Sequence, residues 1–240
     1  LIVDREEEMR KFKPEEYWSI EAKVIPKGSR KSFSASLYSV ENGTIKITTG
    51  EQADKIEADL QNAEYVITKV KNGTRKKSPA PPFITSTLQQ EASRKLGFQS
   101  RRTMKVAQEL YEGVDIEGMG ATGLITYMRT DSVNLAEEAL KDIRDFIGER
   151  YGEDNLPEEP RRFKTKAKNA QEAHEAIRPT SIRVVPDDIK DRLSAEQFKL
   201  YNLIWKGAIA SQMIHATINQ VAVDFSCGAG NQFRANGSTI

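Results

Sequence analysis

The sequence predicts an α+β protein in which a β-rich domain, formed by both ends of the chain, is interrupted by an inserted, mainly helical domain. Two observations support this fold class. Apolar and polar residues alternate in the first eighty residues and again near the C-terminal end, as they do in half-buried strands. Between these parts the apolar period lengthens to about 3.6 residues, which is the period of a helix. We expect a first β part over residues 1–80, the helical domain over 81–210 and a second β part over 211–240.

Alternation and turn signals define the elements of the β parts. The strands that we expect are 18–24, 33–37, 45–47, 65–70 and 220–225. Asn42-Gly43 lies between the second and the third of them, where a hairpin turn needs positive backbone angles. Residues 52–60 are a helix candidate, and Asn72-Gly73 is expected to close the fourth strand. The proline-rich run from Ser78 to Pro82 breaks all periodicity and predicts a domain junction.

The helical domain begins with two predicted helices, 84–96 and 103–111, joined by a short turn. Gly97 can end the first helix and Ser100 can cap the second. With a predicted strand over 124–127, they resemble a helix-turn-helix with an attached wing, which is a DNA-binding unit. Simple helix packing without DNA contact explains the same pattern and is commoner.

Three more helices are expected, at 135–151, 187–193 and 194–213. Ser194 and Gln197 have the spacing of a capping box at the start of the last one. This last helix is also the most apolar of the set, so we expect it at the centre of the domain's core.

The most informative segment is GLITYMRTDS, residues 123–132, which places Tyr127 and Arg129 two apart. On a strand such residues share a face, so the phenol would lie beside the guanidinium. A phenol is a weak nucleophile at neutral pH, and its attack on a phosphodiester needs a cation to stabilise the developing charge. Arg129 can supply that cation through a planar fork of donors. For these residues alone, a half-buried tyrosine and a solvated arginine are the commoner interpretation.

Two further stretches carry groups that suit a nucleic-acid backbone. His174 lies four residues before Arg178, so one helical turn would bring both side chains to the same face. Together they can hold a phosphate, although a lone histidine at a helix end is more often a cap or a packed edge residue. Residues 161–168 hold five basic and no acidic side chains, and they either contact DNA or form a solvated loop.

GLITYMRTDS, with the following VNLAEEA, resembles the active-site segment of the bacterial type IA DNA topoisomerases. The methionine after the tyrosine favours the topoisomerase I branch. Other stretches resemble motifs of this family in the same order: LIVDREEE with FKPEEYWSI, then SPAPPFITSTLQQEASRKLGF at the entry to the active-site domain, then QEAHEAIRPT after the tyrosine. Together these matches cover most of the chain.

The resemblance implies an ATP-independent enzyme that relaxes negative supercoils in DNA. Tyr127 would cut one strand, form a 5′-phosphotyrosyl link and release a 3′ hydroxyl that later reseals the strand. Arg129 would stabilise the transition state. In this family the sheet forms a hinge arch, and the inserted domain, with its winged-helix-like unit, carries the tyrosine. The DNA-binding residues implied by the match are His174, Arg178, Thr130, Asp131 and Ser132, the last three as supports of the loop.

The resemblance also implies Mg²⁺, which the family binds in an amino-terminal Toprim domain of the same polypeptide. This chain has no Asp-x-Asp cluster of that kind, and we expect the Toprim domain and the C-terminal zinc repeats to be missing. Cys227 is the only cysteine, which excludes an internal disulfide and a Cys-based zinc site within one chain. We therefore assign no metal site and expect these residues alone not to relax DNA.

Composition limits the partners. With 36 basic and 35 acidic residues the net charge is +1, so any grip on DNA depends on local patches. No apolar run reaches membrane-spanning length, and the opening residues are highly charged, so we expect neither a membrane partner nor a signal peptide. The expected location is the bacterial cytoplasm, in association with the nucleoid.

Two other functions are considered beside this one. A tyrosine recombinase-like strand transferase also combines tyrosine, arginine and histidine, but it links to a 3′ phosphate. In such enzymes the tyrosine follows the basic residues, whereas Tyr127 precedes His174 and Arg178. The other alternative is a winged-helix DNA-binding module without catalysis, whose function Tyr127→Phe would leave untouched.

Overall fold

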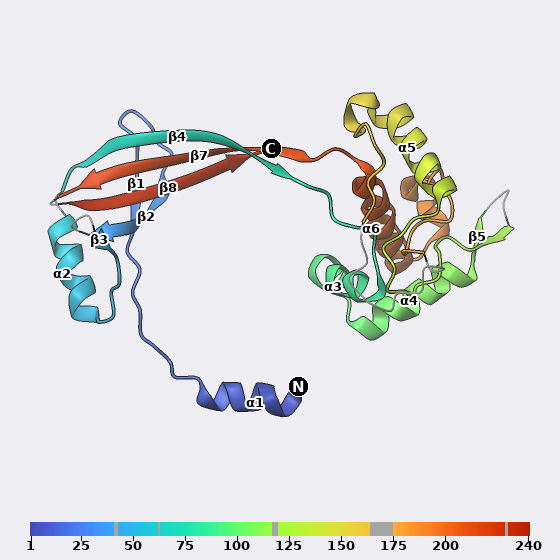
Figure 1. The fold of residues 1–240 in the computed structure, drawn as a ribbon, viewed down its shortest axis with the longest axis horizontal. Helices are drawn as coiled ribbons and strands as arrows, with labels where there is room; N and C mark the ends of the chain where they lie inside the picture. Colours follow the sequence, from blue (N-terminus) through green and yellow to red (C-terminus); the bar gives the residue numbers. More distant parts are fainter. Residues whose placement is uncertain (41–42, 62, 117–119, 164–174, 229) are drawn as a thin grey trace. The chain divides into compact units, whose positions relative to one another are not determined.

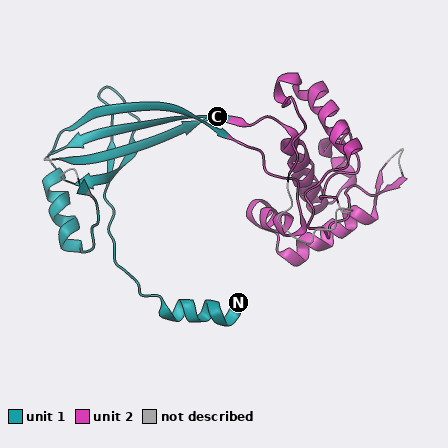
Figure 2. Cartoon of the chain, in the orientation of Figure 1, with its two compact units in different colours: residues 1–76, 217–240 teal, residues 77–216 magenta. Residues whose placement is uncertain are grey.

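The computed structural model describes residues 1–40, 43–61, 63–116, 120–163, 175–228 and 230–240. The chain divides into two compact units (Figure 2): unit 1 combines residues 1–76 with 217–240, and unit 2 holds residues 77–216. Each unit has its own hydrophobic core. None of the helices in the described part of the chain is both long and apolar enough to span a membrane.

Unit 1 is built on one sheet with the strand order β1-β2-β8-β7-β4, and β3 pairs with β2 (Figure 1). The pairs β1–β2, β2–β8 and β7–β8 are antiparallel. The C-terminal strands therefore join the sheet of the first part of the chain, as the alternation predicted. The elements of this unit are α1 (Ile2–Lys11), β1 (Glu21–Val24), β2 (Phe33–Val40), β3 (Gly43–Thr44), α2 (Gly50–Leu60), β4 (Tyr65–Lys77), β7 (Ala216–Cys227) and β8 (Asn231–Thr239).

The core of unit 1 lies on the face of the sheet that carries the apolar residues of the alternation. Ala35 and Leu37 of β2 are buried there with Phe225 of β7 and Phe233 of β8. Leu60 at the end of α2 packs into the same cluster. One-sided burial thus explains why this part of the sequence alternates.

Two details of unit 1 differ from the sequence prediction. Asn72-Gly73 does not end a strand, because β4 continues through it to Lys77 beside the long strand β7. Hydrogen bonding along such a partner overrides a local turn signal. The predicted strands 18–24 and 45–47 shrink to β1 and a single bridge between Trp18 and Ile47.

Unit 2 packs its helices around α6, whose residues Leu200, Tyr201 and Ile204 are completely buried. Its apolar character predicted this central place. Gly97 ends α3 in the left-handed conformation (φ 68°), and Ser194 with Gln197 forms the predicted capping box. The elements are α3 (Thr85–Leu96), α4 (Ser100–Glu112), β5 (Val114–Ile116), β6 (Gly120–Thr122), α5 (Glu137–Tyr151), the 3-10 helices η1 (Glu153–Asn155) and η2 (Pro186–Arg192), and α6 (Ala195–Gln212).

Four predictions for unit 2 are wrong. Ser100 does not cap α4: it is the first residue of the helix, after the N-cap residue Gln99, and no side chain caps this end. Residues 124–127 are not a strand: only Ile125 makes an isolated bridge, to Pro179, and the hairpin β5–β6 lies earlier in the chain. Residues 175–178 are not helical: Ile177 bridges to Phe83, and Pro179 just beyond them bridges to Ile125. Residues 186–192 form a 3-10 helix in place of the predicted α-helix.

Candidate active site

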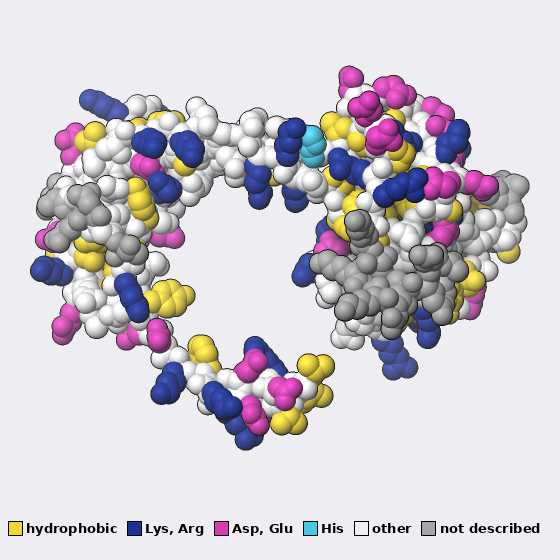
Figure 3. Space-filling model, in the orientation of Figure 1, with side chains coloured by type: hydrophobic (Ala, Val, Ile, Leu, Met, Phe, Trp, Pro, Cys, Tyr) yellow, Lys and Arg dark blue, Asp and Glu magenta, His cyan; other side chains and the backbone are white. Residues whose placement is uncertain are grey.

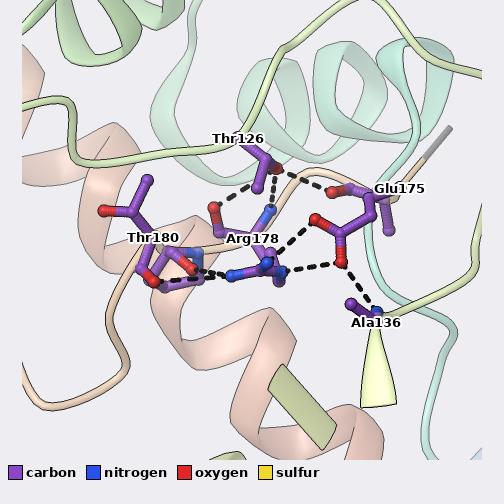
Figure 4. A network of polar contacts seen from close by, with 7 residues as sticks. Thr126, Ala136, Glu175, Arg178 and Thr180 are labelled. Atoms are coloured by element: carbon purple, nitrogen blue, oxygen red, sulfur yellow. Dashed lines mark hydrogen bonds and ion pairs between the residues drawn. The ribbon is translucent and has the colours of Figure 1, made fainter. Parts of the chain in front are cut away.

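The segment before Tyr127 is fixed by backbone pairing with residues 176–180. Thr126 N–H donates to the Arg178 carbonyl at 2.9 Å, and Thr180 N–H donates to the Leu124 carbonyl at 3.0 Å. The Thr126 hydroxyl adds two bonds, donating to the Ala176 carbonyl at 2.7 Å and accepting from Arg178 N–H at 3.0 Å (Figure 4). A short piece of chain far away in sequence therefore holds the residue next to the tyrosine.

Tyr127 itself points outward from this fixed segment. Its exposed fraction is 48%, while Leu124, Ile125 and Met128 are at most 1% exposed. Arg129 is exposed as well. Tyr127 and Arg129 are thus both exposed, with the buried Met128 between them.

The loop after Tyr127 is held by one hydroxyl at the start of α3. The Thr85 hydroxyl donates to the Met128 carbonyl at 2.8 Å and accepts from Thr130 N–H at 2.9 Å. Thr130 and Ser132 are buried, and their hydroxyls accept from the N–H groups of Ser132 and Asn134. These two side chains thus shape the loop from inside.

Arg129 and Asp131 project from this loop into open space. With residues 84–86 they line a surface hollow of about 420 Å³, which lies beside the N-terminal end of α3. A guanidinium next to a helix N-terminus makes this hollow favourable for an anion.

Arg178 is committed to contacts within the protein. Its Nη2 lies 2.8 Å from Glu175 Oε2, and its Nη1 donates to the Pro179 carbonyl at 2.9 Å. Glu175 Oε1 also accepts from Ala136 N–H at 2.7 Å, just before α5 begins (Figure 4). The Arg178 side chain is only 15% exposed. In this state the guanidinium ties 175–180 to the start of α5; His174 lies outside the described residues.

The start of the basic run 161–168 is likewise engaged. Arg161 Nε donates to the Met213 carbonyl at 2.8 Å. Arg162 forms a two-pronged pair with Glu137, whose pKa is lowered by the hydrogen bond. Residues 164–168 lie outside the described part of the chain. Acidic side chains gather over the neighbouring helix α5 (Figure 3), a distribution that disfavours DNA on that surface.

A sequence model of the DNA topoisomerase family matches residues 1–240, the whole chain. The chain belongs to this family. DNA topoisomerase 1 of Xylella fastidiosa (strain 9a5c) is 49% identical, and that of Rickettsia bellii (strain RML369-C) is 46% identical, both over 100% of this chain. The chain spans 30% of the length of each.

A solved structure gives the same assignment. Full-length topoisomerase I from Thermotoga maritima matches 98% of this chain with a TM-score of 0.73 and 32% sequence identity. The match covers 36% of that chain. The mixed α/β fold with its antiparallel sheet is therefore a bacterial topoisomerase I fold.

Within the described residues of this topoisomerase chain, no three His, Cys, Asp or Glu side chains converge on a point that suits a metal ion. Asp131 is an isolated exposed carboxylate beside Arg129 in the loop. These residues therefore do not fit a Mg²⁺ site, and no step of the chemistry is assigned to a metal here.

Sequence reasoning missed four residues that build the candidate site. Thr85 and Thr126 anchor the segments on either side of Tyr127, Glu175 holds Arg178, and Tyr111 packs against the tyrosine ring. Only Glu175 had a usable signal: an acid three residues before an arginine pairs with it on a helix, and the same pair forms here although residues 175–178 are not helical.

Proposed function

We propose that this chain is the central part of an ATP-independent type IA DNA topoisomerase, which cuts one DNA strand, passes the other through and reseals the cut. Relaxation of negative supercoils is the outcome. The observation that carries the proposal is Tyr127, an exposed phenol between the buried residues Ile125 and Met128. The chain is hydrogen-bonded on both sides of it. Such a rigid support presents a nucleophile in one place.

The reaction is a transesterification. Tyr127 Oη attacks the phosphorus of a backbone phosphate, its proton leaves, and a bond between Oη and phosphorus forms. The bond from phosphorus to the 3′ oxygen breaks, and that oxygen takes up a proton as a 3′ hydroxyl. The same hydroxyl later attacks phosphorus and releases the phenol. Because one phosphodiester replaces another, no ATP is needed.

Arg129 would act on the charge that develops in this step. It is exposed, two residues from the nucleophile, and lines the hollow at the start of α3. A guanidinium stabilises both a phenolate and the extra charge on phosphorus, and it does so best where its orientation is fixed. The buried hydroxyls of Thr130 and Ser132 hold the loop from which it projects.

The remaining DNA contacts have separate support. Asp131 lies exposed in the loop. It would act on DNA indirectly, by supporting the loop that carries Arg129. For His174 the support is the family match alone. Arg178 would act through the loop that it braces, because its guanidinium is held by Glu175.

The finer architecture belongs to the same proposal. We regard unit 1 as the arch of the enzyme, and α3, α4 and the hairpin β5–β6 as a winged-helix-like unit next to the tyrosine. The partners would be DNA and a Toprim domain of the same polypeptide, which would supply Mg²⁺. The enzyme would work in the bacterial cytoplasm at the nucleoid.

The test uses the full-length protein that contains this chain, with Tyr127→Phe and, as the matched control, Tyr151→Phe, which removes a hydroxyl from another exposed tyrosine of unit 2. A single-stranded oligonucleotide carries a label at its 5′ or its 3′ end. We expect a covalent adduct that keeps the 3′ label, in the unsubstituted protein and the control only. Retention of the 5′ label would indicate a strand transferase, and adduct formation by Tyr127→Phe would exclude Tyr127 as the nucleophile.

The 240 residues alone are a second test. We expect them to bind DNA without relaxing it, since the Mg²⁺-bearing domain is elsewhere. Relaxation of a supercoiled plasmid by this chain with Mg²⁺ would contradict the proposal.

A further inference from the structure

A second, more apolar hollow adjoins the loop of Tyr127. It has a volume of about 570 Å³ and lies between α3, the residues before it, and α6. Figure 1 shows these two helices beside each other in unit 2. Ile84 lines both this hollow and the one at Arg129, and Val133 lines both this hollow and a smaller one beside 161–163. We call it the α3–α6 groove, defined by Pro82, Phe83, Arg94, Lys95, Lys206 and Gly207.

The chemistry of the groove has two parts. Its apolar lining includes Phe83, which is half-buried, and Pro82, which is buried. Its polar lining includes three cations but only one carboxylate, Glu91, which pairs with Lys95 at 2.9 Å and with Arg94 at 3.3 Å. Lys206 is exposed and has no carboxylate partner among the described residues. A net positive rim therefore surrounds a surface on which flat rings can lie.

The absence of a side chain at Gly207 lets the Phe83 ring pack directly against α6. A Cβ atom at that position would lie 2.6 Å from Cε2 of the Phe83 ring, closer than real contacts allow. Any larger residue must therefore push the ring out of place. Gly207 thus gives a way to disturb the apolar lining without touching a charge.

We propose that the α3–α6 groove binds a short segment of single-stranded nucleic acid, the part of the strand that adjoins the phosphate held at Tyr127. Bases lie against the half-buried Phe83, and phosphates lie near the exposed Lys206 and Lys95. Single strands are bound in this way elsewhere, by aromatic surfaces that take any base and by cations that track the backbone. Ile84 lines both the groove and the hollow of Arg129, so the two are neighbours and one strand can reach both. This inference rests on the proposed function.

The first test measures binding by fluorescence anisotropy of a labelled oligo-dT in the full-length protein carrying Tyr127→Phe, so that cleavage does not interfere. Lys206→Gln is compared with Lys141→Gln, which removes an exposed lysine from α5. We expect Lys206→Gln to weaken binding roughly three- to tenfold at low salt and to reduce the salt slope by about one, as loss of one phosphate contact does. Lys141→Gln should bind as the parent does.

The second test does not depend on a substitution that alters charge. Oligonucleotides containing 5-iodouracil are cross-linked by light and the modified peptide is identified. We expect cross-links within residues 80–84 or 203–210, and fewer of them in Gly207→Ala. Equal affinity of Lys206→Gln and Lys141→Gln, with cross-links elsewhere, would overturn the inference. A failure of the proposed function can be told apart from a failure of this inference. The first would show in the adduct experiment with Tyr127→Phe, and the second in these binding measurements.

Discussion

The ring of Tyr111 packs edge-on against the ring of Tyr127, with the ring centroids 5.4 Å apart and the ring planes at 64°. Tyr111 lies in the last turn of α4 and, like Tyr127, is more than a third exposed. The contact restricts how the Tyr127 ring can turn. The exposed Tyr127 ring is thus oriented by a second exposed ring.

This contact predicts an effect of Tyr111→Ala on strand cleavage. Aromatic pairs of this geometry add roughly 0.5–1.5 kcal/mol beyond area burial, which corresponds to a factor of about two to twelve. We expect the rate of adduct formation in the full-length protein to fall by about that factor. Tyr111→Phe keeps the ring and should cleave at nearly the parent rate. Equal rates for Tyr111→Ala and the parent would show that the ring contact does not matter for the reaction.

Gly123 leaves no room for a side chain under Tyr111. A Cβ atom there would lie 2.7 Å from the Tyr111 carbonyl oxygen, and a backbone atom cannot move aside cheaply. We expect Gly123→Ala to cost about 1–3 kcal/mol of stability, as overpacking does, and to slow cleavage because the Tyr127 segment shifts. Thermal melting of unit 2 measures the first effect. Gly73→Ala, at a position with open space around it, is the control and should melt as the parent does.

Thr85 fixes the loop after the tyrosine through its hydroxyl. Thr85→Val keeps the shape but leaves Thr130 N–H and the Met128 carbonyl without this partner, while the Thr130 carbonyl keeps its bond from Thr85 N–H at 3.0 Å. Leaving such groups unpaired costs about 1–3 kcal/mol, so we expect a lower melting temperature. Thr85→Ser retains the hydroxyl and should lose much less. Equal melting temperatures for Thr85→Val and Thr85→Ser would show that the Thr85 hydroxyl does not hold the loop.

The fold could be predicted where burial is one-sided. In β2, Ala35 and Leu37 are buried and Ser34 and Ser36 are exposed because one face of the sheet meets the core, and this pattern survives in the sequence. Residues 124–127 misled for the opposite reason. Their apolar members are buried, but they pair with the short stretch 176–180, about fifty residues later. A local sequence pattern cannot show that these two stretches pair, or that the pairing is too irregular to form strands.

The site could be predicted only in part. The Tyr127-Met128-Arg129 triplet revealed an outward tyrosine and arginine, since a buried residue between two exposed ones leaves a clear local trace. Tyr111 and Thr85 left no such trace, because they reach the site through helix packing and loop closure over 16 and 45 residues of sequence. Tertiary contacts of this kind depend on the whole unit and not on spacing.

Glu175 and Arg178 form a largely buried pair, with side chains 30% and 15% exposed. Arg178→Met should cost about 1–3 kcal/mol of stability, because it leaves the Glu175 carboxylate partly buried without its cation. Glu175→Gln keeps an acceptor for Ala136 N–H and should cost less. In the double variant we expect less destabilisation than the sum of the two, and urea unfolding of all four proteins measures this coupling. Simple additivity would mean that the pair does not stabilise the site.

Asp224 predicts how unit 1 responds to pH. It lies directly opposite Arg234 across β7 and β8, with Arg234 Nε 2.6 Å from its Oδ1 and Nη2 3.0 Å from its Oδ2. The hydrogen bond from Arg234 lowers the pKa of the Asp224 carboxyl below its usual range. A depressed folded-state pKa means that the pair stabilises the fold above the unfolded pKa of about 3.9, and that this contribution is lost as the pH falls through the lower folded value.

Asp224→Asn removes this dependence. At pH 7 we expect the variant to be less stable by roughly 0.2–1 kcal/mol, the range for opposite charges facing each other across strands. As the pH falls below about 4, the difference from the parent should shrink, because the parent carboxylate becomes protonated as well. Melting curves at both pH values measure this, with Asp54→Asn on α2 as the control for loss of an exposed carboxylate. A difference that stayed constant with pH would show that packing at this position, and not its charge, stabilises the sheet.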